Sequence, residues 1–178
     1  ALPAFAQAPT PGPATSPAPT PGMPGTTAPA APAAAPAAPA AAPMAYGAPI
    51  TLEKAKAAMQ AAEAEAQKNK WPVAISIIDS AGYEVMFSRL DNTQYASIRI
   101  AHGKAKAALE FKRPSKALQD AVAAGGAGLR LLSVPDAMLL EGGVLVVSDG
   151  KIIGAIGVSG VTSTQDAQVA MVGADAAK

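Results

Sequence analysis

The chain has 178 residues, a formal net charge of +1 at pH 7, a single histidine and no cysteine. A charge so close to neutral, with lysines and arginines scattered along the chain, argues against a nucleic-acid-binding surface. Without cysteine the chain has no disulfide, no thiolate nucleophile and no cysteine-ligated metal, and no apolar run approaches the ~20 residues that span a bilayer.

The first part of the chain is set apart by its composition. Fourteen of the seventeen prolines lie at or before Pro49, and the first charged residue is Glu53. An uncharged Ala/Pro tract lacks the apolar mass that offsets the entropy of folding. We therefore expect residues 1–49 to be a disordered Ala/Pro-rich linker with polyproline II character, and residues 50–178 to form one folded domain.

The extreme N-terminus carries a separate signal. The tripeptide Ala6-Gln7-Ala8 has the small-x-small pattern of a signal-peptidase site. This pattern predicts that the segment is the remnant of a secretory signal peptide. We therefore expect the protein to be periplasmic or secreted.

The folded part is expected to begin with an amphipathic helix. Thr51 is a suitable N-cap residue, and the helix should end near Asn69, before Trp71-Pro72. Apolar residues recur at three- and four-residue spacing along one face of this stretch. They are Leu52, Ala55, Met59, Ala62 and Ala66.

Two strands joined by a turn should follow, over residues 73–79 and 83–89. The second strand carries apolar residues on both faces, which predicts a sheet covered on both sides by helices. Asp79, at the end of the first strand, is expected to cap backbone N–H groups of the turn. It is also a candidate general base.

A long helix is predicted over residues 93–111, and it contains the only histidine. His102 and Tyr95 lie at the margin of a broad apolar arc, and a second apolar patch suggests that the helix also faces a partner subunit. A neutral imidazole here can ligate haem iron, transfer protons or simply pack. A single histidine excludes a two-histidine metal site within one chain.

Ser115 is expected to cap a short helix that reaches about Ala124 and ends at the glycines that follow. A short strand over residues 138–140 would then lead into a β-hairpin. The hairpin strands cover residues 144–148 and 151–159, and Asp149-Gly150 is typical of the tight turn between them.

A final helix is expected after Ser163, which forms a capping-box pattern with Asp166. Its N-terminus would lie beside the loop over residues 157–160, where backbone N–H groups favour an anion such as a substrate carboxylate. Asp166 can fill the same position itself.

Taken together, these motifs resemble the GlcG/HbpS family of haem-binding proteins over roughly residues 50–178. The resemblance rests on their order along the chain. The matching motifs are residues 73–79 with Gly82, Arg89-Leu90-Asp91, Ala96-Ser97-Ile98, Lys104-Ala105, Phe111 with Arg113-Pro114, Gly142-Gly143, Asp149-Gly150, residues 154–160 and Gln165-Asp166.

The resemblance implies a single α/β (α+β) domain, with a five-stranded antiparallel sheet flanked by helices on both faces. It also implies a homo-oligomer and haem as the cofactor. Members of the family include exported haem-binding and haem-degrading proteins and haem-binding domains of other enzymes. It does not place an iron ligand in this chain.

The candidate site therefore comes from the chemistry of the residues. His102, as the metal ligand, or Tyr95 would lie near the iron, and Arg89, Lys104 or Lys106 would pair with the propionates. Backbone close to a ligand or a neighbouring subunit is expected at Gly142, Gly143, Ser159 and Gly160.

Two other functions fit the same residues. The first is an enzyme acting on a small hydroxy or oxo acid, with His102 or Asp79 as general base. The second is an assembly or sensor-partner module that binds no small ligand. This last hypothesis predicts a tight oligomer.

Overall fold

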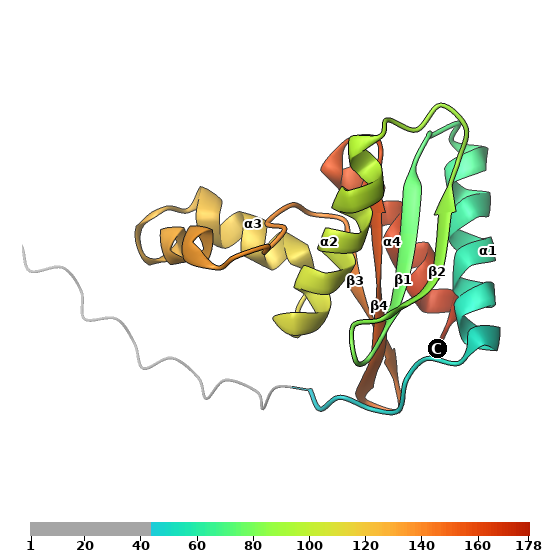
Figure 1. Cartoon of the computed structure of the whole chain (residues 1–178), viewed down its shortest axis with the longest axis horizontal. Helices are drawn as coiled ribbons and strands as arrows, with labels where there is room; N and C mark the ends of the chain where they lie inside the picture. Colours follow the sequence, from blue (N-terminus) through green and yellow to red (C-terminus); the bar gives the residue numbers. More distant parts are fainter. Residues whose placement is uncertain (1–43) are drawn as a thin grey trace, which may run out of the picture. The chain divides into compact units, whose positions relative to one another are not determined.

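The structure is a computed structural model that describes residues 44–178, so the predicted secretory remnant and most of the predicted linker lie outside the described residues. Figure 1 shows the elements in chain order. They are α1 (Leu52–Lys68), β1 (Ala74–Asp79), β2 (Glu84–Arg89), α2 (Ala96–Glu110), α3 (Ser115–Ala123), the 3-10 helix η1 (Gly126–Ser133), β3 (Gly143–Ser148), β4 (Lys151–Ser159) and α4 (Ser163–Ala176).

Within the described residues the sheet has four strands, in the order β2-β1-β4-β3, and every neighbouring pair is antiparallel. The expectation of a fifth strand is therefore wrong. Residues 138–140 do not join the sheet, and Met138 lies against Gly103 of α2. A parallel bridge between Tyr46 and Ile152 extends the pairing beside the start of β4.

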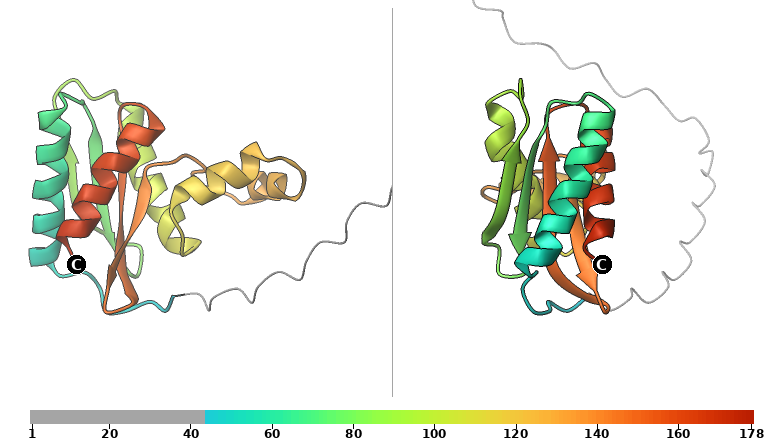
Figure 2. Two further views of the ribbon diagram at one scale, coloured as in Figure 1. Left: turned by 180° about the vertical axis from the view of Figure 1, so that it is seen from behind. Right: turned by 90° about the vertical axis from the view of Figure 1, so that its right-hand side faces the viewer.

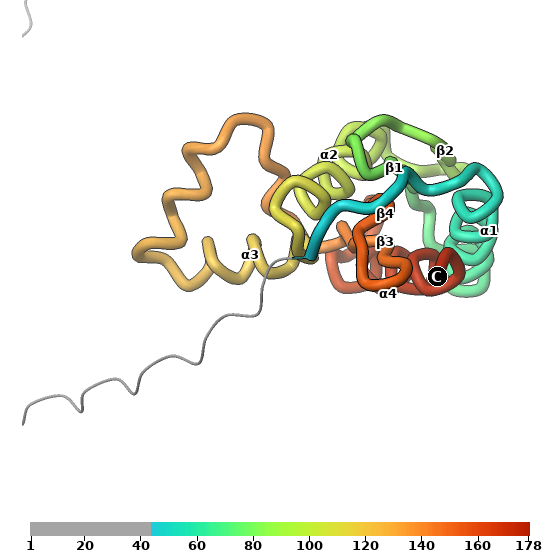
Figure 3. Tube along the Cα trace, turned by 90° about the horizontal axis from the view of Figure 1, so that it is seen from below, coloured from blue at the N-terminus to red at the C-terminus, as the bar shows by residue number. Residues whose placement is uncertain are grey.

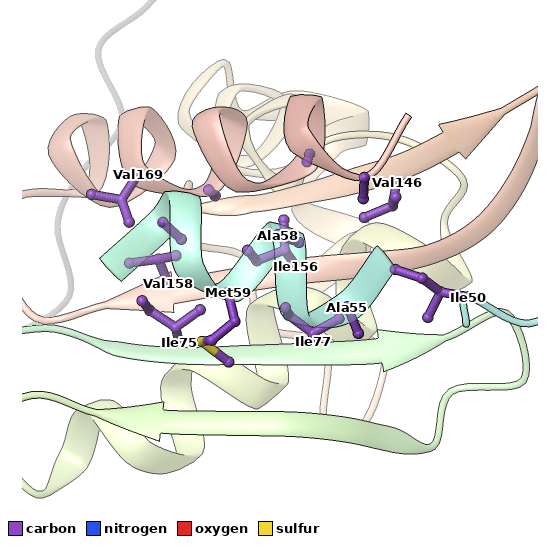
Figure 4. Packing of buried hydrophobic residues seen from close by; sticks show 14 of the residues in the cluster. Ile50, Ala55, Ala58, Met59, Ile75, Ile77, Val146, Ile156, Val158 and Val169 are labelled. Atoms are coloured by element: carbon purple, nitrogen blue, oxygen red, sulfur yellow. The ribbon is translucent and has the colours of Figure 1, made fainter. Parts of the chain in front are cut away.

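Helices cover both faces of the sheet, as expected from the apolar residues on both sides of its strands. Helices α1 and α4 lie together on one face, and α2 lies on the other (Figures 1 and 2). Figure 4 shows the larger core, in which Ile75, Ile77, Ile156 and Val158 of the sheet meet α1. On the α2 side a smaller cluster joins Ile78 and Ala155 to Ala105, Ala108 and Leu109.

Local signals fixed the turns and most helix ends. Asp149 and Gly150 both have positive φ, 51° and 71°, as the hairpin motif predicts. Thr51 caps α1 by accepting a hydrogen bond from Lys54 N at 3.3 Å.

Two predicted caps are displaced. The capping box of α4 is formed by Thr162 and Gln165, one residue before the expected pair. Ser115 does not cap α3, because its hydroxyl accepts a hydrogen bond from Gly143 N at 2.8 Å. The Ser115 side chain, which local rules assigned to a helix end, therefore makes a contact between α3 and β3 instead.

Helix α3 and η1 extend away from the sheet as an arm (Figures 2 and 3). No residue of η1 is buried. The arm encloses an open groove of about 760 Å³ whose apolar walls include Phe111, Leu118 and Leu131. Four apolar side chains in and just after η1 are exposed: Leu129, Leu132, Val134 and Leu140. Among the described helices, none combines the length and hydropathy needed to cross a membrane.

Candidate functional site

The single histidine, His102, lies on the side of α2 that faces strands β1 and β2. Its Nδ1 atom is 3.4 Å from Ser76 Oγ of β1 and 3.7 Å from Glu84 Oε1 of β2. Ser76 Oγ in turn donates a hydrogen bond to Glu84 Oε1 at 3.0 Å. Ser76 is fully buried, whereas the side chains of His102 and Glu84 are 40% and 43% exposed.

The side chains around this histidine form a surface that we call the α2–β2 face. On β2, Phe87 and Arg89 pair across the strands with Ser76 and Ala74, so they point to the same side of the sheet as the histidine contact. On α2, helical spacing places the other members beside His102. The α2–β2 face consists of Glu84, Phe87, Arg89, Tyr95, Ile98, Arg99, His102 and Lys106.

Apolar and cationic groups are interleaved on this face. Phe87 and Ile98 are 39% and 37% exposed, and Tyr95 is 81% exposed. The Arg89 guanidinium lies over the Tyr95 ring, 5.6 Å from its centroid. Lys106 is 3.7 Å from Glu110, one helical turn along α2. Three of the residues predicted for the site, Arg89, Tyr95 and His102, are thus brought together with Lys106 nearby.

Lys104 is not part of this face. It is 2% exposed, and its Nζ donates to Asp166 Oδ2 at 2.7 Å and to Val158 O at 3.0 Å. Its ammonium therefore joins α2 to β4 and α4 in the interior, where a haem propionate on the surface has no access to it.

The glycine-rich backbone belongs to the same buried region. Gly142 has a φ of 125°, and a side chain there would meet Lys104 Nζ and Val158 O. A side chain at Gly143 would meet Lys104 O, and one at Gly160 would meet Pro72 O. Ser159 Oγ donates to Ser97 Oγ at 3.2 Å. The close backbone approaches expected at these positions are made by the chain itself.

The residues suggested as the site of a small-acid enzyme are also engaged in contacts within the chain. Asp166 Oδ1 accepts a hydrogen bond from Val161 N at 3.2 Å, so it occupies the start of α4 where a substrate carboxylate was considered. Asp79 Oδ1 accepts from Ala81 N at 2.9 Å and from Tyr83 N at 3.0 Å, which is the turn-capping role predicted for it.

Glu84 and Ser76 are members of the site that sequence reasoning missed. They lie 18 and 26 positions from His102 in the sequence, and only the pairing of β1 with β2 under α2 brings them to it. One signal was present in the sequence. Ser76 is a polar residue in the middle of the otherwise apolar run of residues 73–78.

Comparisons with known proteins agree with this architecture. A family model described as "Haem degrading protein HbpS-like" matches residues 50–175. Protein GlcG of Escherichia coli (strain K12) is 40% identical over 110 residues, which are 62% of this chain and 81% of GlcG.

Two solved structures share the fold. A double mutant of HbpS from Streptomyces reticuli matches with a TM-score of 0.67 and 30% identity, over 81% of this chain and 97% of that chain. A structure described as a PduOC:haem complex matches with a TM-score of 0.66 and 29% identity, over 72% of this chain and 94% of that chain. The second is a relative solved with haem bound.

Proposed function

The chain belongs to the family of HbpS-like haem degrading proteins, and we propose that it is an exported, oligomeric protein that binds haem on the α2–β2 face. The haem complex of the relative PduOC supports haem as the ligand. The observation that carries the choice of site is the orientation of His102. Its Nδ1 meets Ser76 and Glu84, while Nε2 has no hydrogen-bond partner among the described residues.

The α2–β2 face has the groups that haem requires. A protein-bound haem needs a donor atom for the iron, apolar contact for the porphyrin and cations for the two propionates. His102 provides the donor nitrogen, and Phe87 and Ile98 provide exposed apolar surface beside it. Arg89 and Lys106 are the nearby cations. The residues present therefore fit the group.

The residues of the α2–β2 face can be assigned separate roles in haem binding. Bound haem would supply the redox and oxygen chemistry of its iron. His102 Nε2 would hold the iron, and Tyr95, which carries the second candidate donor atom, lies 7 positions earlier at the N-cap of α2. Arg89, which stacks on Tyr95, is able to turn from the ring to a propionate.

A hemin titration of the full chain tests this function. We expect a shifted Soret band that saturates at a defined stoichiometry. In His102→Ala the shifted band should be lost and then restored by added free imidazole, because the small base replaces the missing ligand. Lys116→Ala, an exposed change on α3, is the matched control and should bind like the wild type.

Other results would contradict the proposal. Absence of saturable binding by the wild type would remove haem as the ligand and favour the assembly or sensor-partner alternative. An unchanged spectrum in His102→Ala would leave haem in place but remove His102 as its ligand.

Oligomerisation is part of the proposal because apolar side chains of the arm are exposed to solvent in a single protomer. Leu129 and Leu132 are 49% and 65% exposed, and η1 has no buried residue. Runs of 3-10 helix longer than 3–4 residues are uncommon because their hydrogen-bond geometry is poor, and η1 has 8 residues. We take a second copy of the chain as the cover.

Export to the periplasm or the medium is the remaining part of the proposal, and it rests on the Ala6-Gln7-Ala8 pattern alone. Expression of the protein from its native gene in a bacterial host, followed by fractionation, tests it. Recovery only in the cytosolic fraction would contradict it.

A further inference from the structure

The contacts of His102 determine which of its two ring nitrogens carries a proton. A carboxylate has only acceptor atoms, and a serine hydroxyl has one proton to donate. Ser76 Oγ donates that proton to Glu84 Oε1 at 3.0 Å, the shorter of its two contacts. The hydroxyl oxygen is left as an acceptor towards His102 Nδ1, 3.4 Å away.

Both groups that face Nδ1 are therefore acceptors. Glu84 Oε1, at 3.7 Å from Nδ1, acts in the same direction as the serine oxygen. A neutral imidazole has one N–H donor and one acceptor nitrogen. If Nδ1 donates, Nε2 must carry the lone pair, and it is Nε2 that lacks a protein partner among the described residues.

We propose that Ser76 and Glu84 are positioning residues that hold His102 in its Nδ1–H tautomer and so make Nε2 the atom that meets the ligand. The ligand class follows from this. An Nε2 lone pair binds a Lewis-acidic metal centre such as haem iron, whereas an anion would need an N–H donor at that position. The choice of haem iron rests on the proposed function, but the tautomer rests only on the contacts of the apo protein.

The arrangement also strengthens the donor. A histidine that ligates a metal usually donates its other N–H to a carboxylate or carbonyl, which fixes the ring and makes the ligand more basic. Ser76 is buried in β1, the central part of the sheet, so its oxygen is held in place by the strand. Glu84 adds negative charge at the edge strand β2. Neither residue has to touch the ligand.

The tautomer can be read directly because the chain contains one histidine. Nitrogen-15 NMR of the full apo chain, recorded at about pH 9 where a histidine ring is ordinarily neutral, distinguishes a protonated from an unprotonated ring nitrogen. We expect the proton on Nδ1. A wild-type spectrum with the proton on Nε2 would overturn the inference, whatever the hemin titration shows.

Substitutions then assign the effect to the two residues. Glu84→Gln and the double variant Ser76→Ala/Glu84→Gln should shift the population towards the Nε2–H form. The matched control is Ser88→Ala, which removes a serine–glutamate hydrogen bond, from Ser88 Oγ to Glu63, on the opposite side of β2. Equal spectral changes in the control and in Glu84→Gln would overturn the inference.

Hemin gives the independent second readout. Loss of such an outer partner typically weakens metal binding about 10- to 100-fold, so Glu84→Gln should bind hemin more weakly by a factor in that range. Its haem reduction potential should rise, because a less basic imidazole stabilises the ferric state less. In a His102→Ala background the Glu84→Gln change should have no further effect.

The two proposals fail in different ways. A wild type that has the Nδ1–H tautomer but no saturable hemin binding would remove the haem function and leave the role of Ser76 and Glu84 supported. Haem binding that is lost in His102→Ala but insensitive to Glu84→Gln would keep the function and overturn the positioning role.

Discussion

At the scale of single residues, Lys104 shows that a buried charge serves to pair with another buried charge and is not available to a ligand at the surface. The Lys104–Asp166 ion pair is almost completely buried, with side chains 2% and 3% exposed. Burial raises the pKa of the Asp166 carboxyl, while the Lys104 ammonium and the N–H groups of Val161 and Gly160 act in the opposite direction. The pair therefore joins α2 to α4, and Lys104 also contacts β4. Each charge needs the other to offset the cost of its burial.

We predict that removing one partner is much more damaging than removing both. Lys104→Met or Asp166→Asn alone should lower the free energy of unfolding by about 3–5 kcal/mol, because each leaves a buried charge without its counter-charge. The double variant should lose clearly less than the sum of the two. Urea unfolding of the four proteins measures this double-mutant cycle.

The cycle has an internal check. Lys106→Met removes a lysine from the exposed side of the same helix, where the pair with Glu110 is solvated, and should change stability by less than about 1 kcal/mol. Additive losses from the two single variants at the buried pair would show that Lys104 and Asp166 are not coupled.

At the scale of elements, glycines determine how closely α2 lies on the sheet. A side chain at Gly157 of β4 would meet the α2 backbone at Ala101 O and Ala105 N. Because His102 lies between these two residues on α2, the depth at which the helix sits affects the contact of its ring with Ser76. The packing of one helix on one strand thus links the glycine-rich hairpin to the candidate site.

We predict that Gly157→Ala moves α2 and disturbs the histidine. It should destabilise the fold by about 1–3 kcal/mol through overpacking, and it should shift the single imidazole signal in NMR. Gly150→Ala is the control, because nothing lies within 4 Å of a side chain there and only its φ of 71° is unfavourable. An imidazole signal that moves equally in both variants would contradict this link.

At the scale of the whole molecule, the described residues form one compact unit, and its arm is the part with the least internal support. Helix α3 and η1 contact each other more than they contact the sheet (Figure 3). Exposed leucines on such an arm are unfavourable in a lone protomer, because apolar surface is stabilised by removal from water. A second copy of the chain, as proposed above, would remove these leucines from water.

We predict that the arm controls assembly. Leu129→Ser/Leu132→Ser should lower the oligomeric mass in sedimentation velocity, while the far-ultraviolet circular dichroism of the protomer stays close to that of the wild type. Met171→Ser is the control, since Met171 is 50% exposed on α4, away from the arm. An oligomer unchanged by the arm variant, or a wild type that is monomeric at all concentrations tested, would contradict the prediction.

Local chemistry determined much of the fold from the sequence. The hairpin at Asp149-Gly150, the helix that Thr51 starts and the apolar strand β1 follow from the properties of nearby residues, so they could be predicted without any long-range information. Helices on both faces were predicted from the apolar residues on both faces of the second strand, residues 83–89. The order of motifs along the chain also indicated the family to which it belongs.

Only the tertiary structure decided how distant polar residues are paired. Lys104 with Asp166, Ser115 with Gly143, and Ser76 and Glu84 with His102 all join different elements. Spacing rules describe neighbours within one helix or strand, so they placed Lys104 with the surface cations and Ser115 at a helix cap. Burial and strand pairing overrule such local preferences, because a polar group removed from water needs a partner wherever the fold provides one.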